Sequence, residues 1–398
     1  MINISESISR MRKAYLCAPI LMGMMFIVTN TQAELPIEEI GRTTLPSQPD
    51  PHWVWVSDVV VNHLEAGKAF LIDGDSGDFL GMLSTGVLFM ALSLPKDYAE
   101  IYSAETYYSR GVRGARSDVV VVYDPVTLLP SDEIAIPNKR GTNFSTSLNT
   151  QLTDDDKFML VYNFTPAQTV SVVDVKQRRF LGEIETAGCA LVYASGDRQF
   201  FSLCGDGGLL SVHLSEKGTT LRKYRSKPFF DAQNDPIQED GVRVEDQWIF
   251  VSYGNNVYTV DVAGEQPQFP AHWSLLNDSE RAEGWQTGGL QLLAAHSSSR
   301  RLYVAMHQGG LYSQDDAGTE IWVYDIDTHK RLQRIKTKYP VTSIHVSEDD
   351  QPLLFTLFAE RPQLDVYDAR TGDFLRSVEQ LGSTPMVLQT PWRALSHK

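Results

Sequence analysis

The sequence predicts an all-β fold, a seven-bladed β-propeller, from three observations. A strand–turn–strand pattern recurs along the chain, with β-branched residues, an aspartate, a turn and a second alternating segment. From Asp73 to Asp368, six intervals between copies give a mean spacing of about 49 residues, which matches one four-stranded propeller blade of about 40–50 residues. Glycine is plentiful, at 28, and the 19 prolines scatter between the copies, as a turn-rich all-β chain requires.

Seven copies of this hairpin pattern can be recognised. They span Phe70–Leu83, Val120–Pro137, Val170–Ile184, Leu209–Tyr224, Val257–Phe269, Ile321–Ile335 and Leu364–Val378. Their key positions are Asp73, Asp124, Asp174, His213, Asp261, Asp325 and Asp368, with His213 in place of the aspartate in one degenerate copy. An isolated hairpin is marginal in water, but blades bury their faces against one another in a closed ring. We expect the aspartates to accept hydrogen bonds from the backbone amides of their turns.

Residues 1–33 have the pattern of a secretory signal peptide. A basic stretch, Arg10, Arg12 and Lys13, precedes the apolar run Tyr15–Val28, and small residues place the cleavage after Ala33. An N-terminal membrane anchor is the alternative, but this run is short for a membrane span. Cleavage would remove three positive charges and one negative charge, so the formal net charge would change from −15 to −17. The pattern therefore predicts an exported protein with no membrane span after cleavage.

The remaining chain divides into an arm and one large domain. Residues 34–52 contain four prolines and are expected to form an extended arm. The strand pattern of Trp53–Asn62 enters the first blade, and residues 53–398 are expected to form the propeller, because seven copies use most of the 398 residues. Trp273–Gly289 contains the only convincing helical piece, which Asn277 or Asp278 could cap and which would end at Gly284.

Two cysteines remain after cleavage, Cys189 and Cys204, and they flank a strand-like segment in one copy of the pattern. A lone pair of cysteines in an exported protein favours a disulfide. The loop that this disulfide would close is short, so the chain-entropy model predicts that the bond stabilises the fold by about 3 kcal/mol. Two free thiols are the alternative.

Composition and motifs exclude several functions. The pI of about 5.0 and the absence of a concentrated basic segment argue against nucleic-acid binding. None of the nine histidines has a zinc-binding spacing, and no nucleophile elbow is present. The sequence thus offers no catalytic residue and no metal ligand. A propeller can still assemble a central metal site from distant strands, so a metal-dependent propeller enzyme and an exported scaffold both remain open.

Several strings go beyond a generic propeller. They are Arg110–Pro130 (RGVRGARSDVVVVYDPVTLLP), the cysteine pair followed by Gly205–Leu210, Arg225–Ile237, Trp273–Gly289, Glu348–Leu357 and Arg376–Val387. Together they resemble the heavy subunit of the tryptophan tryptophylquinone (TTQ) amine dehydrogenases, the family of methylamine and aromatic (aralkyl)amine dehydrogenases. The resemblance covers roughly residues 53–390. Some strings are closer to the aromatic-amine branch and others to the methylamine branch.

The resemblance implies a function for the chain. In that family the heavy subunit is a periplasmic seven-bladed propeller that pairs with a cysteine-rich light subunit in an α2β2 heterotetramer. The light subunit carries the TTQ cofactor, so this chain would hold no cofactor of its own. The enzyme oxidises a primary amine to an aldehyde and ammonia, and a blue copper protein of the amicyanin or azurin type accepts the electrons. Under this reading the seven tryptophans of this chain serve packing.

The resemblance also implies a substrate-channel position. In the family, a phenylalanine near the start of blade one lines the channel to the quinone. The matching segment is Asp58–Leu64, in which the position falls at Val61 or Asn62, so the phenylalanine is absent. The alternative is that both residues pack inside the first blade and never contact substrate.

Overall fold

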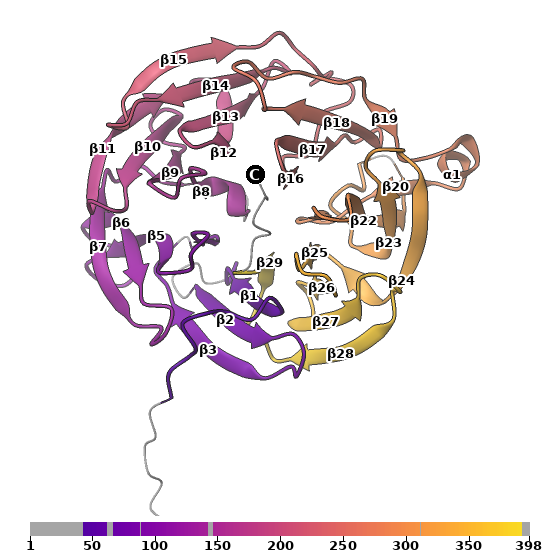
Figure 1. Cartoon of the computed structure of the whole chain (residues 1–398), viewed down its shortest axis with the longest axis horizontal. Coiled ribbons are helices and arrows are strands. Elements are labelled where there is room, and N and C mark those ends of the chain that lie inside the picture. The colour runs from indigo at the N-terminus through magenta and orange to yellow at the C-terminus, as the bar shows by residue number, and fades with distance from the viewer. Residues whose placement is uncertain (1–42, 62–66, 88, 142–145, 311, 392–398) are drawn as a thin grey trace, which may run out of the picture. The chain divides into compact units, whose positions relative to one another are not determined.

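Seven antiparallel sheets are arranged in a ring in a computed structural model of the chain, which describes residues 43–61, 67–87, 89–141, 146–310 and 312–391 (Figure 1). Each sheet is one blade, so the predicted all-β seven-bladed propeller is confirmed. The predicted signal peptide and the first part of the predicted arm lie outside the described residues. The described part of the arm contains neither helix nor strand.

The blades follow one another along the chain, and their strands run outward from the centre of the ring. Blade one contains β29 (Pro385–Gln389), β1 (Trp53–Asp58), β2 (Lys68–Asp73) and β3 (Phe79–Ser84). Blade two contains β4 (Leu92–Ser93), β5 (Ile101–Tyr108), β6 (Arg116–Tyr123) and β7 (Pro130–Ile136). Blade three contains β8 (Thr150–Leu152), β9 (Phe158–Asn163), β10 (Thr169–Asp174) and β11 (Arg179–Glu185), after a short 3-10 helix, η1 (Ser147–Asn149).

The other four blades complete the ring. Blade four contains β12 (Cys189–Gly196), β13 (Gln199–Cys204), β14 (Leu209–Leu214) and β15 (Thr220–Arg225). Blade five contains β16 (Val242–Val244), β17 (Gln247–Val251), β18 (Asn256–Asp261) and β19 (Trp273–Ser274). Blade six contains β20 (Trp285–Thr287), β21 (Leu293–His296), β22 (Arg301–Gln308), β23 (Gly318–Asp325) and β24 (Arg331–Val341). Blade seven contains β25 (Ser343–Val346), β26 (Leu353–Phe358), β27 (Gln363–Asp368) and β28 (Phe374–Glu379).

The core lies between neighbouring blades, because both faces of each sheet are covered. Side chains alternate across a strand, so Val54 packs toward blade seven while Trp55 packs toward blade two. Val121 likewise faces blade one and Val120 faces blade three. This double burial explains why the central strands are continuous apolar runs rather than alternating ones.

Blade one closes the ring, because its innermost strand comes from the end of the described chain. β29 pairs antiparallel with β1, with Val56 opposite Leu388. Glutamine side chains satisfy the inner strand edges, where backbone groups would otherwise be unpaired. The amide of Gln389 exchanges two hydrogen bonds with the backbone of Leu92, and Gln291 does the same with Leu388.

The repeated aspartates cap their turns as expected. Carboxylate oxygens of Asp73, Asp124, Asp174, Asp261, Asp325 and Asp368 accept hydrogen bonds from backbone amides two or three residues further on. These bonds hold the pKa of Asp124 below its usual range. His213 keeps the register position, opposite Gln199. In this turn the Ser215 hydroxyl, and not His213, accepts the hydrogen bonds from the backbone amides.

Two predicted segments differ from the structure in their bounds. The second half of Val257–Phe269 was expected to be a strand, but after Asp261 only one isolated bridge to Gln268 forms, and the outer strand begins at Trp273. Prolines at 267 and 270 explain the interruption, because proline cannot donate to a strand ladder. The predicted helix, α1 (Asp278–Ala282), is capped by Asn277 through a capping box and ends before Gly284.

Candidate functional site

The ring has two faces, which can be told apart by the strand connections that emerge on each. Because all strands are antiparallel, the connections between the second and third strand of every blade emerge on one face, here called the loop face. These connections are residues 59–67, 109–115, 164–168, 205–208, 252–255, 309–317 and 359–362. The aspartate-capped turns between the third and fourth strands emerge on the opposite face, here called the turn face.

Val61, one of the two predicted channel residues, lies on the loop face at the end of a tightly held turn. Its side chain is 50% exposed, and its backbone amide donates to the Thr384 hydroxyl at 2.8 Å. Val60 before it has a φ of 52°, a left-handed conformation that a β-branched residue rarely adopts. Asn62, the other predicted residue, lies outside the described residues.

A buried carboxylate holds this turn in place. Asp58 is 1% exposed and accepts hydrogen bonds from the amides of Ser383 (2.9 Å), Thr384 (2.8 Å) and Val60 (3.3 Å). A Cβ atom on Gly382 would lie only 2.0 Å from the Asp58 carboxylate, so glycine is required there. Strained backbone persists only where its surroundings fix it, and Asp58 provides that restraint for Val60.

Other loops contribute exposed apolar side chains to the same face. Five of the seven connections do so, with Val61, Val112, Phe164, Tyr253 and Tyr312 at 38–77% exposure. Single exposed apolar residues need no explanation. Their recurrence at one structural position in five blades gives the loop face an apolar character that favours contact with another protein.

A buried charge network fixes the loop of blade two in which the family string Arg110–Pro130 begins. The Asp118 carboxylate is bidentate with Arg116, at 2.8 and 2.7 Å, and accepts from the Thr106 hydroxyl and the Arg140 amide. Arg140 is buried and donates to Thr106 and to the Val87 carbonyl. Burial lowers the pKa of Arg140 to about 10 against the attraction of Asp118, so the guanidinium of Arg140 stays charged at neutral pH.

The structure contains the predicted disulfide between Cys189 and Cys204. The two residues face each other across β12 and β13 at the loop-face end of blade four. Arg225 donates one hydrogen bond to the Cys189 sulfur and another to Asp206. Both sulfurs are buried, which separates the bond from solvent.

The disulfide leads to a direct expectation for the processed protein. A thiol reagent added to denatured, unreduced protein should find no reactive cysteine, and after reduction it should find two. Because both sulfurs are buried in the fold, the count must be made in denaturant. Two reactive thiols before reduction would contradict the disulfide.

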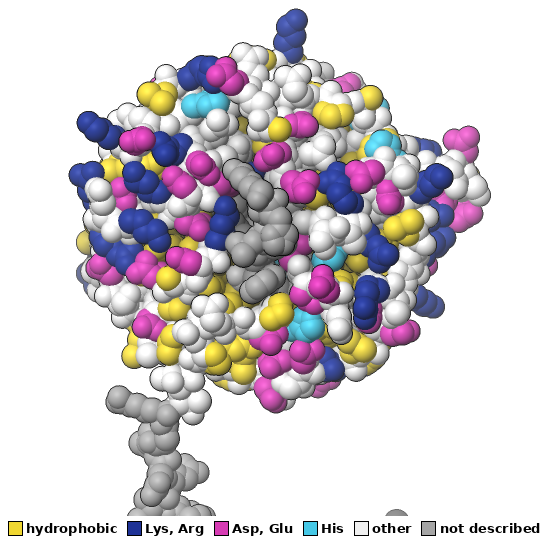
Figure 2. All heavy atoms as spheres, viewed as in Figure 1, with side chains coloured by type: hydrophobic (Ala, Val, Ile, Leu, Met, Phe, Trp, Pro, Cys, Tyr) yellow, Lys and Arg dark blue, Asp and Glu magenta, His cyan; other side chains and the backbone are white. Residues whose placement is uncertain are grey.

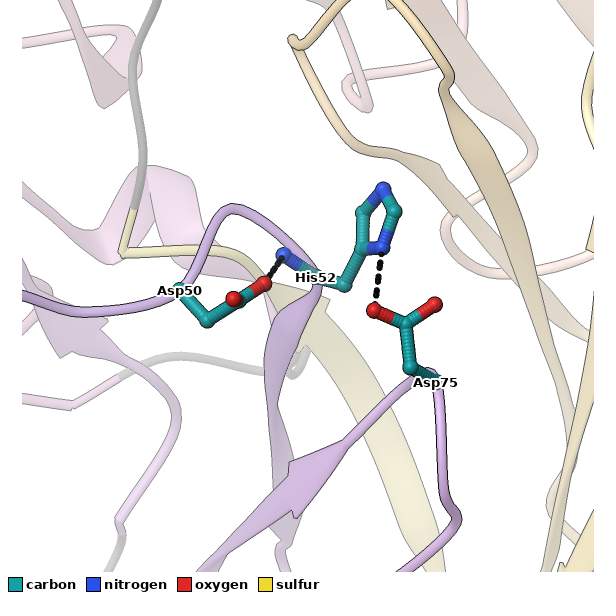
Figure 3. Close-up of side chains that lie close together, drawn as sticks. All are labelled: Asp50, His52 and Asp75. Atoms are coloured by element: carbon teal, nitrogen blue, oxygen red, sulfur yellow. Dashed lines mark hydrogen bonds and ion pairs between the residues drawn. The ribbon is translucent and has the colours of Figure 1, made fainter.

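One group on the turn face has side chains of the types that bind metals. Asp50, His52 and Asp75 bring potential donor atoms within 4.8 Å of one another (Figure 3). The His52 ring, however, has Nδ1 at 2.8 Å from Asp75 and Nε2 at 3.2 Å from Asp349. A metal needs a free lone pair on one ring nitrogen, whereas two carboxylate partners favour a proton on each. The geometry therefore describes an ion-paired histidine.

The described surface gives little sign of other sites. The two best-formed depressions of the described surface have cavity volumes of only about 10 Å³ each, far less than the roughly 300–1,000 Å³ of an ordinary ligand pocket. Acidic and basic side chains are interspersed over the described part of the face in Figure 2, without a continuous basic surface. Within the described residues, no helix is both long enough and apolar enough to span a bilayer.

Together these features define a class, a seven-bladed propeller whose loop face presents exposed apolar side chains from five blades. The methylamine dehydrogenase heavy chain family model matches residues 50–391. The chain is 32% identical over 345 residues to the methylamine dehydrogenase heavy chain of Paracoccus versutus, covering 86% of this chain and 80% of the relative. It is 30% identical over 323 residues to the methylamine dehydrogenase heavy chain of Methylorubrum extorquens, covering 81% of this chain and 78% of the relative. The chain belongs to the methylamine dehydrogenase heavy chain family.

Solved structures with lower identity share only the fold. Dihydro-heme d1 dehydrogenase NirN superimposes with a TM-score of 0.51 at 16% identity, over 84% of this chain and 66% of that one. A functionally unknown protein from Desulfotomaculum acetoxidans superimposes with a TM-score of 0.53 at 11% identity, over 85% of this chain and 98% of that one. These matches support the propeller architecture.

Proposed function

We propose that this chain is the heavy subunit of a periplasmic TTQ amine dehydrogenase. The family membership over residues 50–391 carries this proposal. A light subunit would carry the quinone and form an α2β2 heterotetramer with this chain. The disulfide and the predicted signal peptide support an exported protein.

The loop face suits the docking of the light subunit. It presents apolar side chains from five blades, and apolar and aromatic residues are enriched at protein interfaces. On this face Val61, or Asn62 next to it, would line the channel through which the amine reaches the quinone. Asp58 would keep that wall in a fixed position, and the docked surfaces would exclude water.

The reaction chemistry would come from the light subunit. The quinone would supply the two-electron oxidation of a primary amine, which with water would become an aldehyde and ammonia with release of two protons. A blue copper protein of the amicyanin or azurin type would receive the electrons. The curated relatives named here are methylamine dehydrogenase heavy chains, which favours methylamine over an aralkylamine as substrate.

Four of the described tryptophans pack inside the propeller, as expected for a chain that does not carry the quinone. Trp55 donates to the Tyr98 hydroxyl, Trp248 donates to the Ala194 carbonyl, and the ring of Trp322 packs at a tilt against that of Trp285. All four are at most 7% exposed, so their rings belong to the blade interfaces.

The proposal predicts that this chain is inactive alone. Expressed without a light subunit, it should show no visible quinone absorption and no amine oxidation with an artificial electron acceptor. Co-expression with a family light subunit should yield a complex with both properties. Activity of the isolated chain would overturn the subunit assignment in favour of a propeller enzyme, and failure to bind any light subunit would favour a scaffold.

A further inference from the structure

The described part of the N-terminal arm contacts three blades on the turn face. The Leu45 amide donates to the Val126 carbonyl at 2.9 Å in the β6–β7 turn of blade two. Its side chain packs against the core cluster between blades one and two. Seven residues later, the His52 carbonyl accepts from the Gly74 amide at 2.9 Å in the β2–β3 turn of blade one. The arm therefore crosses the boundary between blades two and one.

His52 extends these contacts to blade seven. Its Nδ1 lies 2.8 Å from Asp75 in the blade-one turn, and its Nε2 lies 3.2 Å from Asp349 in the β25–β26 turn of blade seven. The side chains of His52 and Asp349 are only 14% and 17% exposed, whereas Asp75 is 61% exposed. The ring of His52 thus bridges the first and last blades. Figure 3 shows its contact with Asp75.

We propose that residues 45–52 are a strap that secures ring closure on the turn face, and that its fastening is a doubly protonated His52 held between Asp75 and Asp349. The β29–β1 pairing joins the chain ends within one sheet, and the Ser343 hydroxyl of blade seven donates to the Met386 carbonyl of β29. On the turn face, Arg376 of blade seven donates to the Gly74 carbonyl of blade one. The strap adds a polar link across that boundary. Nδ1 is hydrogen-bonded to Asp75, and Nε2 lies at ion-pair distance from Asp349. Loss of one proton from His52 removes the positive charge that both carboxylates attract.

The surrounding charges favour the protonated form. Burial opposes the charge on His52, but the hydrogen bond to Asp75 and the attraction of Asp349 outweigh it and raise the pKa of His52 above 6.5. Burial likewise opposes the charge on Asp349, but its hydrogen bonds and His52 lower its pKa below 3.8. The other charged or titratable groups around the fastening are Asp50 on the arm, Glu348 beside Asp349, His296 on the Asp349 carbonyl, Arg370 in the β27–β28 turn and Arg376 on the Gly74 carbonyl.

The directions of these two pKa shifts define the pH range in which the strap is most stable. A raised histidine pKa contributes stability that is complete below about 6.5 and is lost as the pH rises through the folded-state pKa. A lowered aspartate pKa contributes stability that is complete above about 3.8 and is lost as the pH falls through its folded-state value. The strap is therefore tightest between about pH 4 and 6.5 and loosens in alkaline solution.

Hydrogen exchange at the Gly74 amide tests the strap, because that amide donates to the His52 carbonyl. The full processed chain is measured at about pH 6 and pH 9 with correction for intrinsic exchange. We expect protection to fall about tenfold from the lower to the higher pH, because the charge on His52 is lost as the pH rises. His52→Gln should show the weaker protection at both pH values. Asp349→Asn should also weaken protection at pH 6.

The matched control is Asp350→Asn, which removes the same charge from an exposed neighbour in the same turn and should behave like the parent protein. Equal protection in His52→Gln and the parent at pH 6 would overturn the strap. A pH dependence that persists in His52→Gln would assign the titration to another group. Protection that requires added Zn²⁺ after treatment with a chelator would show a metal-held cluster instead.

Discussion

Replacing Asp118 with alanine is expected to lower the free energy of unfolding by about 3–5 kcal/mol, the cost of breaking a buried ion pair from one side. The Asp118 side chain has no exposure, and four hydrogen bonds reach it from Thr106, Arg116 and Arg140. Without the carboxylate, the buried guanidinium of Arg140 loses its main counter-charge. The loop of residues 109–115 on the loop face would loosen with it.

Urea unfolding of the purified chain measures this loss as a lower midpoint. Asp78→Ala serves as the control, because Asp78 is an exposed aspartate beside β3, and such a change costs at most about 0.5 kcal/mol. The loss for Asp118→Asn should fall between those of the two alanine variants, since asparagine keeps one acceptor oxygen but removes the charge. A loss below about 1 kcal/mol for Asp118→Ala would show that water or other groups compensate Arg140.

Val61→Phe in the assembled complex is expected to lower kcat/KM for benzylamine about ten- to hundredfold more than for methylamine. The added ring would restore the bulk that the family places at this channel position. One methylene in a pocket is worth about 1–3 kcal/mol of discrimination, and an aromatic ring occupies far more space. Asn62→Phe tests the neighbouring position in the same way.

Val112→Phe is the matched control for this channel test, because Val112 is similarly exposed, at 57%, in the corresponding loop of blade two. It adds the same ring to the same face in another blade, so the ratio between the two amines should stay at the parent value. Equal changes for both amines in the Val61 and Asn62 variants would show that neither position lines the channel.

The strand pattern and the turn aspartates were predictable because both are local. A strand shows its period of two within six residues, and an aspartate such as Asp325 bonds amides only two or three residues away. The register at His213 could be predicted for the same reason, although the sequence did not show that Ser215 takes over the hydrogen bonds. The interruption after Asp261 could have been anticipated from its two prolines.

The polar contacts that hold the candidate site could not be predicted. Asp58 bonds the amides of residues more than 300 positions away, and this proximity exists only after the ring closes. The link from His52 to Asp349 has the same origin. Val61 was identified by family resemblance alone, because half-exposed valine in a loop carries no chemical signal of its own.

Ring closure by β29 also sets an order of events during synthesis. Strand β1 emerges among the first and β29 among the last, so β1 must wait with one open edge while more than 300 residues are made. An open strand edge invites pairing with other chains. Export in an unfolded form would postpone this exposure until the whole chain has crossed the membrane. A chain truncated after Glu379 would keep the open edge permanently, and we expect it to aggregate rather than to persist as a ring with a three-stranded blade one.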